Sequence, residues 1–357
     1  MLHMTQVSPP ARRFGPDFVE AMRRRYGKRP AAQRQLTYAI AVEEEFTAWR
    51  DWLDRQLLLL PQATVDDLAG RLWLDEHFWP VMIELAAGAG LRAAGLDVAY
   101  QQAWDGQTPD WTVLSGTGRP LCFVEVHTDN PSRETYGHMR AWHGLVERIK
   151  QIPVSVVLTL APTGGPIPPP NAHTAKKVAQ DLRGELMRPW PRPSFTSQGY
   201  TFLVMAEPLG GGMMASPSGL HACFEPPSSM AGIVSARQLA DRVADKTRKY
   251  AGLAEAHGVP LVVAVGAHRF TGVGLKQLDE LLAGSLTTTM QFNLGDTWIG
   301  EQTFDMGRPD RWEMPAELAG VLWVDNRWPF GLAWRANPAA HRPVGALGAA
   351  LSHPPVT

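Results

Sequence analysis

"TPDWTVLSGTGRPLCFVEVHT", residues 108–128, is the stretch that decides the fold. It predicts two short strands joined by a glycine-rich turn. Each strand carries one acidic residue among apolar neighbours, Asp110 in the first and Glu125 in the second. An acid inside the apolar run "CFVEV" is unfavourable unless it is paired or bound to a metal. The hairpin is therefore a candidate functional site, although "TPDW" is also good turn chemistry and Asp110 could simply begin a strand.

The spacing of the acids predicts where their side chains lie. Side chains alternate between the two faces of a strand, so Glu125 and His127 share one face. If the strand of Asp110 pairs with that of Glu125, the two carboxylates converge, and Glu84 on the preceding helix (79–95) adds a third acid. Mg²⁺ typically takes one or two carboxylates and keeps several waters. The pattern predicts a divalent cation held by Asp110 and Glu125, where it can activate water and polarise a phosphoryl oxygen.

Helices and strands alternate along the rest of the chain. A strand is predicted at 96–104, a helix at 134–152 and a buried strand at 153–162. A helix followed by a buried strand is predicted at 235–266, where Leu239, Val243 and Tyr250 form the buried stripe of the helix. This alternation predicts an α/β fold with a mixed sheet flanked by helices.

The hairpin also resembles a known family. "PD" at 109–110 and "EVH" at 125–127 are similar to the PD-(D/E)XK motif of restriction-endonuclease-like proteins. The order helix, three strands, helix, strand over 79–160 is similar as well, and so is the unit at 235–266. The resemblance implies a restriction-endonuclease-like core and a nuclease or phosphodiesterase that acts on nucleic acid with Mg²⁺ or Mn²⁺. It implies Asp110 and Glu125 as metal ligands and Glu84 as an accessory acid.

The motif departs from the family at its third residue, which is His127 in place of lysine. Histidine is mostly neutral at pH 7, so it could be a general base or a metal ligand, or it could mark a site that has lost hydrolysis. In this family a lysine from another element sometimes takes the vacant role. Lys246 is the candidate, because Leu239 and Val243 on the same helix face the core. The alternative is an ordinary solvated lysine on a helix surface.

The sequence divides into an N-terminal helical region, 1–70, and an α/β domain, 71–357, with a proline-rich insertion near 163–198. The helical region carries a basic run that favours a solvated helix face, with a phosphate-facing patch as the alternative. The members of this run are Arg23, Arg24, Arg25, Lys28 and Arg29.

Composition narrows the functional classes. The chain has 357 residues, a net charge of −1 and two cysteines. No global basic field attracts nucleic acid, no apolar run is long enough to cross a membrane, and the few cysteines favour the cytoplasm. Phosphate-loop, "GxSxG" and "HExxH" motifs do not occur. Nucleic acid is the expected partner, and the oligomeric state is not predicted. The neutral charge and the missing lysine favour an alternative: an inactive or repurposed member of the fold, serving as a binding protein or a small-molecule biosynthetic enzyme.

Overall fold

The computed structural model describes residues 12–30, 33–131, 133–154, 156–161, 163, 167–205, 222–224, 226, 236–268, 273–284, 287–294, 297–305 and 311–352. The helices are α1 (Pro16–Met22), η1 (Arg23–Gly27), α2 (Tyr38–Val42), η3 (Glu44–Phe46), α3 (Thr47–Leu57), α4 (Gln62–Arg71), α5 (Asp75–Ala93), α6 (Arg133–Ile149), α7 (Ala172–Leu186), α8 (Ala236–His257), α9 (Leu275–Ala283) and α10 (Ala346–Ser352). The strands are β1 (Asp97–Tyr100), β2 (Trp111–Leu114), β3 (Pro120–Asp129), β4 (Val157–Leu160), β5 (Ser194–Ser197), β6 (Tyr200–Met205), β7 (Cys223–Phe224), β8 (Leu261–Ala267), β9 (Thr287–Leu294), β10 (Thr297–Asp305), β11 (Leu318–Val324) and β12 (Leu332–Ala336).

A six-stranded mixed sheet forms the main body, in the order β1-β2-β3-β8-β11-β12. Strands β1, β2 and β3 form an antiparallel meander. Strands β3, β8 and β11 run parallel, and β12 closes the sheet in the antiparallel direction. The prediction of an α/β fold with a mixed sheet is confirmed. The predicted hairpin is also present, because β2 pairs with β3 and Trp111 lies opposite Val124.

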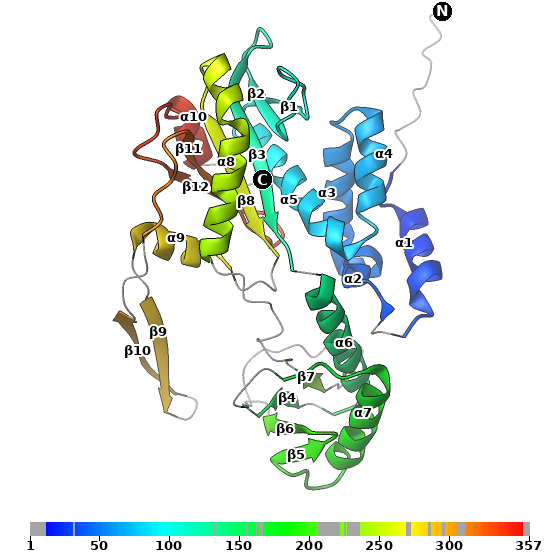
Figure 1. The fold of residues 1–357 in the computed structure, drawn as a ribbon. Helices are drawn as coiled ribbons and strands as arrows, with labels where there is room; N and C mark the ends of the chain where they lie inside the picture. The colour runs from blue at the N-terminus through cyan, green and yellow to red at the C-terminus, as the bar shows by residue number, and fades with distance from the viewer. Residues whose placement is uncertain are drawn as a thin grey trace, which may run out of the picture.

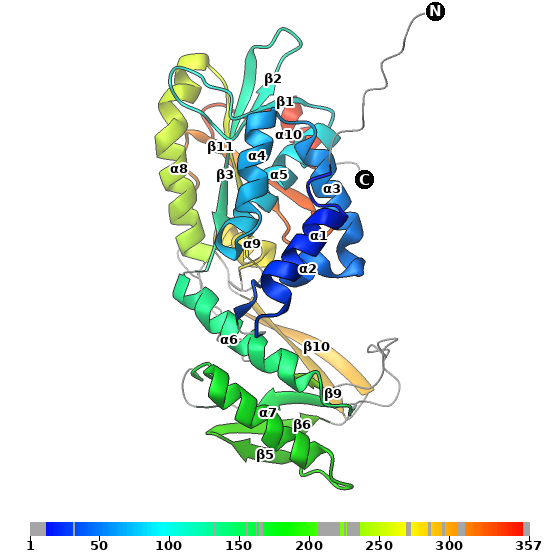
Figure 2. The same cartoon turned by 90° about the vertical axis from the view of Figure 1, so that its right-hand side faces the viewer.

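Helices cover the two faces of this sheet (Figures 1 and 2). On the α5 face, Ile83 and Ala87 pack against Trp111, Val124 and residues of β8. The helix approaches β2 so closely that a Cβ on Gly88 would lie 2.1 Å from the Trp111 ring. A larger residue at this position would therefore push α5 away from the strand that follows Asp110.

Helix α8 covers the opposite face. Leu239 and Val243 pack against β8, while Tyr250 and Leu253 pack near Phe123 at the other end of the helix. The helix therefore runs antiparallel to β3, so that residues later in α8 lie beside residues earlier in β3. The buried stripe predicted for this helix is confirmed, since Leu239, Val243 and Tyr250 are all almost fully buried.

The N-terminal helices pack on the first half of α5, and they share one apolar core with it. Trp49 lies at its centre, with aromatic rings of Phe78, Trp79 and Phe330 around it at centroid distances between 5.5 and 6.2 Å. The buried Asp75 accepts hydrogen bonds from the backbone of Leu36 and Thr37. The helical region is therefore joined to the α/β domain through α5.

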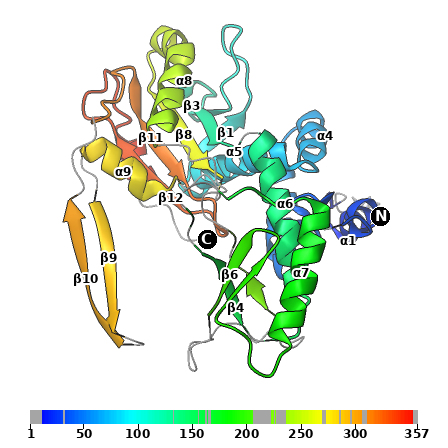
Figure 3. The same cartoon turned by 60° about the horizontal axis from the view of Figure 1, so that its bottom comes forward.

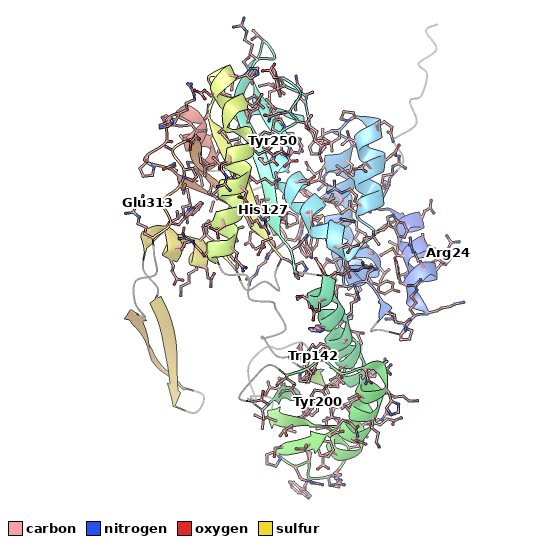
Figure 4. The ribbon with its side chains drawn as sticks, in the orientation of Figure 1. Arg24, His127, Trp142, Tyr200, Tyr250 and Glu313 are labelled. Atoms are coloured by element: carbon pink, nitrogen blue, oxygen red, sulfur yellow. The ribbon has the colours of Figure 1, made fainter. Side chains whose placement is uncertain are left out.

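A second, four-stranded sheet has the order β5-β6-β4-β7 and carries α6 and α7 (Figure 3). It has its own apolar core, in which the rings of Trp142 and Tyr200 lie 5.7 Å apart (Figure 4). The resemblance gives the order helix, three strands, helix, strand over 79–160, but the structure does not keep these elements in one sheet. The predicted strand 153–162 is β4 of the second sheet, and β8 takes the place beside β3.

Strands β9 and β10 form a long antiparallel hairpin that was not predicted from the sequence. It leaves the main body next to α9 and stands apart from the main sheet (Figures 1 and 3). None of the helices in the described part of the chain combines the length and the apolar character needed to cross a membrane.

Candidate active site

Glu125 lies in the middle of β3 and faces α8, as the alternation of side chains predicts. It is 2% exposed. Its Oε1 accepts a hydrogen bond from Lys246 Nζ at 2.5 Å. The Lys246 side chain is 31% exposed, so part of it contacts solvent while its amine reaches Glu125 on the sheet. The structure therefore brings together two of the residues that the sequence singled out, and it replaces the solvated-lysine alternative with a partly buried ion pair.

Asp110 lies directly before β2, beside Glu125. Its Oδ2 accepts a hydrogen bond from the Val126 amide at 2.7 Å, and its backbone oxygen accepts one from the Gln101 amide at 2.9 Å. The carboxylate is thereby fixed against β3. Burial raises the pKa of Asp110 to about 7, and the neighbouring charges of Glu125 and Glu84 contribute. Burial and the neighbouring acids thus both disfavour the charged form of Asp110, and the charge of Lys246 only partly offsets them.

Glu84 reaches the same place from α5. Tyr100 donates its hydroxyl to Glu84 Oε2 at 2.9 Å, and Arg71 lies 3.6 Å from Oε1. The Trp111 indole donates to the Glu84 backbone oxygen at 2.9 Å. Burial raises the pKa of Glu84, with a smaller contribution from the charge of Glu125. Tyr100 and Arg71 were not foreseen, because they come from separate elements and only the fold makes them neighbours of Glu84.

Tyr250 ties α8 to the segment that carries Asp110. It is 2% exposed, and its hydroxyl donates to the Thr108 backbone oxygen at 3.1 Å and accepts from Lys249 Nζ at 2.9 Å. Burial raises the pKa of Tyr250, and the charges of Glu125 and Asp110 raise it further. In Figure 4, Tyr250 and His127 lie at successive levels along α8. The sequence identified Tyr250 as a core residue, but nothing in the periodicity indicates its hydroxyl contact.

His127 shares the α8 face with Glu125. Burial, together with the nearby charges of Lys246 and Arg242, lowers the pKa of His127 to about 4. The imidazole is therefore neutral at pH 7 and cannot supply the positive charge of the family's lysine. Its Nε2 is buried and has no hydrogen-bond partner among the described residues.

Buried polar atoms without a partner are concentrated at this end of β3. Seven such side-chain atoms occur in the described part of the chain, and five of them belong to residues between 125 and 130. Most buried polar groups in folded proteins are satisfied, so such a concentration indicates a missing ligand, ion or water. One of the five is Glu125 Oε2, which lies beside Asp110.

The donor set fits a hard divalent cation held by two carboxylates. Asp110 and Glu125 offer oxygens of the kind that Mg²⁺ and Mn²⁺ bind, and Glu125 Oε2 lacks a partner among the described residues. Within those residues no group of three or more His, Cys, Asp or Glu side chains is arranged to hold a metal. A cation here would therefore depend on two protein ligands and complete its shell with water or substrate oxygens, as Mg²⁺ commonly does.

The basic residues of the N-terminal region lie elsewhere. Arg23, Arg24, Arg25, Lys28 and Arg29 are exposed, as a solvated face requires. Arg25 and Arg29 lie over the Tyr26 ring at 5.3 and 5.0 Å. Figure 4 shows Arg24 at the outer edge of the molecule, away from His127 and Tyr250. These residues do not belong to the carboxylate site.

Comparison of the chain with protein-family models, with curated proteins and with solved structures gave no match.

Proposed function

We propose that this protein is a metal-dependent phosphodiesterase that cleaves nucleic acid, built on a restriction-endonuclease-like core. The observation that carries the proposal is the contact of Lys246 Nζ with Glu125 Oε1, beside Asp110. The motif lacks its lysine at position 127, and α8 supplies a lysine amine to the same carboxylate. The amine and the two acids are the groups that the resemblance implies, and His127 is the departure from it.

The arrangement of elements supports the same proposal. Helix α5 precedes the meander β1-β2-β3, and α8 leads into β8, which pairs parallel with β3. The resemblance gave the order helix, three strands, helix, strand over 79–160; in the main sheet α8 and β8 take the places of that last helix and strand, with the second sheet inserted between β3 and α8. The insertion explains why the motif residues and Lys246 lie 121 positions apart in the chain.

Each residue has a definite task in this proposal. When bound, Mg²⁺ or Mn²⁺ would polarise a phosphoryl oxygen and lower the pKa of a bound water. Asp110 and Glu125 would hold the cation, and Glu84 would add negative charge from the α5 side. Lys246 would donate a hydrogen bond from its ammonium group to a phosphate oxygen, stabilising the charge that develops there. His127, neutral at pH 7, would accept a proton from the attacking water at Nε2.

The alternative is a protein with this fold that binds without hydrolysis or that acts on a small molecule. One observation favours it: Glu125 and Lys246 already neutralise each other, and such a pair can serve structure alone. Mn²⁺ binding separates the nuclease from a protein that only binds, since a structural ion pair gives Asp110 no reason to bind a cation, and the nucleic-acid cleavage assay separates it from an enzyme that acts on a small molecule.

The test is cleavage of labelled single- and double-stranded DNA and RNA with Mn²⁺. We expect the wild type to cleave at least one of these. Asp110→Asn and Lys246→Ala should each reduce the rate by about 10²–10³-fold, the loss typical for removing one group that stabilises transition-state charge. Lys276→Ala is the matched control, because Lys276 is an exposed helix lysine paired with Glu280 at 3.7 Å. A wild type that cleaves none of the substrates would refute the proposal, as would equal rates for the two lysine variants.

A further inference from the structure

A small basic pocket lies where the N-terminal helical region meets the end of α6. Its volume is about 210 Å³, and its lining includes Arg29 and Arg34 from the helical region and Arg148 from the last turn of α6. One acid, Glu147, lies among the lining residues, so the pocket is net positive. Sites for drug-sized ligands are larger, usually about 300–1,000 Å³. The pocket therefore suits a single small anionic group.

The chain around this pocket is basic, although the protein as a whole is not. Residues 21–42 contain six Lys and Arg side chains and no Asp or Glu, in a chain whose net charge is −1. Five of the six are fully exposed: Arg23, Arg24, Arg25, Lys28 and Arg29. A local cluster of this kind is the electrostatic footprint by which proteins attract nucleic acid.

Two of the pocket arginines are held in place by contacts of their own. Arg34 donates from Nε to the Arg29 backbone oxygen at 3.1 Å and from Nη2 to the Gly27 backbone oxygen at 3.0 Å. The Arg34 guanidinium lies 5.3 Å from the ring centroid of Tyr38, and that of Arg29 lies 5.0 Å from the ring centroid of Tyr26. Because these planar groups are already positioned, less conformational entropy is lost when they bind an anion.

We propose that Arg29, Arg34 and Arg148 bind a backbone phosphate of nucleic acid. The inference rests on the proposed function, which supplies nucleic acid as the ligand. Arg148 forms no ion pair with any residue that the structure describes, so its guanidinium is available for a phosphate. Arginine matches phosphate geometry with two parallel N–H groups. A phosphate contact of this kind positions the nucleic acid without reading its sequence.

The phosphate pocket and the carboxylate site are separated by the length of α6. This helix leads away from β3 (Figures 1 and 2). Its 17 residues span about 25 Å, at ~1.5 Å per residue. A duplex rises about 3.4 Å per base pair, so roughly seven base pairs are needed to cover this length. A shorter nucleic acid that occupies the carboxylate site should therefore not reach Arg148.

The experiment measures binding by fluorescence anisotropy over a series of salt concentrations, in a chelator that prevents cleavage. The probes are labelled DNA and RNA duplexes of about 20 base pairs and hairpins with stems of about five. Arg29→Ala and Arg148→Ala should each weaken binding of the long probe by about three- to fivefold. Each should also lower the slope of log K against log salt by about 1. Binding of the hairpin should not change.

Two further variants sharpen the test. Glu147→Gln should tighten binding of the long probe, because it removes the acid that lines the pocket. Arg119→Ala is the matched control: Arg119 is an exposed arginine in the turn between β2 and β3, which lies at the opposite end of the main sheet from α6 (Figure 1). It should bind both probes like the wild type. Circular dichroism checks that each variant is folded.

The outcomes separate this inference from the proposed function. Equal binding of the long probe by the wild type, Arg29→Ala and Arg148→Ala would overturn the phosphate pocket. A wild type that cleaves the small diester bis(p-nitrophenyl) phosphate with Mn²⁺ but binds no long probe would also overturn it and leave the phosphodiester chemistry. If the arginine variants lose affinity for the long probe alone and the wild type cleaves no phosphodiester, the pocket is supported and the proposed function is refuted.

Discussion

Two glutamates of this protein are equally buried and differ in their partners. Glu125 in the main sheet and Glu185 in the second unit are each 2% exposed. Glu185 Oε1 lies 3.1 Å from Arg192 Nε, and its Oε2 lies 3.0 Å from Arg188. Both of its oxygens are satisfied by arginines at the surface. Glu125 has one lysine, an oxygen without a partner among the described residues, and the like charges of Asp110 and Glu84 nearby.

The proposed function rests on this difference between a structural acid and a candidate functional one. Burial alone does not distinguish them. An acid whose oxygens both meet cations is stable as it stands, whereas acids that meet each other remain in unfavourable contact until a cation or proton arrives. Perturbed carboxyl groups of this second kind concentrate at functional sites. The pKa of Asp110, raised to about 7, places the main-sheet cluster in that class.

The largest expected effect comes from exchanging the two glutamates for glutamine. Glu125→Gln should lower cleavage with Mn²⁺ by about 10²–10³-fold, because it removes a metal ligand and the partner of Lys246. Glu185→Gln should leave the cleavage rate unchanged and lower the free energy of unfolding by about 1–2 kcal/mol through its weakened arginine contacts. Rate assays and thermal unfolding check both. If Glu185→Gln lost cleavage and Glu125→Gln kept it, Glu185 rather than Glu125 would be the functional acid.

Asp110→Asn should stabilise the metal-free protein at high pH. The pKa of Asp110 is raised from 3.8 to about 7 in the folded state, so the folded protein holds a proton that the unfolded chain releases between these values. The free energy of unfolding therefore falls as pH rises through this window. Asparagine can still accept the Val126 amide and carries no charge. Its advantage should approach zero near pH 4 and reach on the order of 4 kcal/mol at pH 8.

The measurement is thermal unfolding of the Asp110 variant and the wild type in a metal chelator, at pH 4 and at pH 8. An equal difference in Tm at the two pH values would mean that Asp110 does not titrate in this window.

His127→Ala should lower cleavage by about 10²-fold, the usual contribution of a positioned general base. The pKa of His127 is lowered to about 4, so its deprotonation does not produce a rise in activity between pH 6 and 7. A histidine with an unperturbed pKa of about 6.5 would have produced a rise in activity in that pH range. The rate of the wild type should therefore show no His127-dependent step above pH 6, and His127→Lys should retain cleavage. A step near pH 6.5 that disappears in the alanine variant would contradict this.

The smallest expected effect on cleavage is that of removing the Tyr250 hydroxyl, and Tyr200 provides the comparison. Tyr250 donates to the Thr108 backbone oxygen beside the acids, and Tyr200 donates to the Pro168 backbone oxygen in the second unit at 3.0 Å. Changing either to phenylalanine should destabilise the fold by about 1 kcal/mol. Only Tyr250→Phe should also reduce cleavage, by a few-fold, because Thr108 precedes Asp110 by two residues. Equal cleavage by the two variants would show that Tyr250 serves stability alone.

The elements of this site were predictable where the signal was local. Alternation along β3 placed Glu125 and His127 on one face, and helical spacing from Leu239 and Val243 brought Lys246 to the sheet. Strand pairing was not predictable in the same way. The apolar runs of β4 and β8 look alike in sequence, and only tertiary packing assigns β4 to the second sheet and β8 to the position beside β3.

The same reasoning explains the contacts that were missed. Arg71 and Tyr100 meet Glu84 from different elements, and no periodicity joins them. The β9–β10 hairpin was missed although its strands are long. The raised pKa of Asp110 and the lowered pKa of His127 depend on burial and on charges brought together by the fold, so neither follows from residue type.

The most direct test of the central claim is anomalous diffraction from crystals soaked in Mn²⁺. The account predicts a peak between the carboxylates of Asp110 and Glu125, at about 2 Å from an oxygen of each, the distance usual for such small hard cations. Lys246 should remain within reach of Glu125 with its amine directed at the solvent shell of the ion. At saturating Mn²⁺, the absence of any peak between the two carboxylates, with the contact of Lys246 and Glu125 intact, would contradict it.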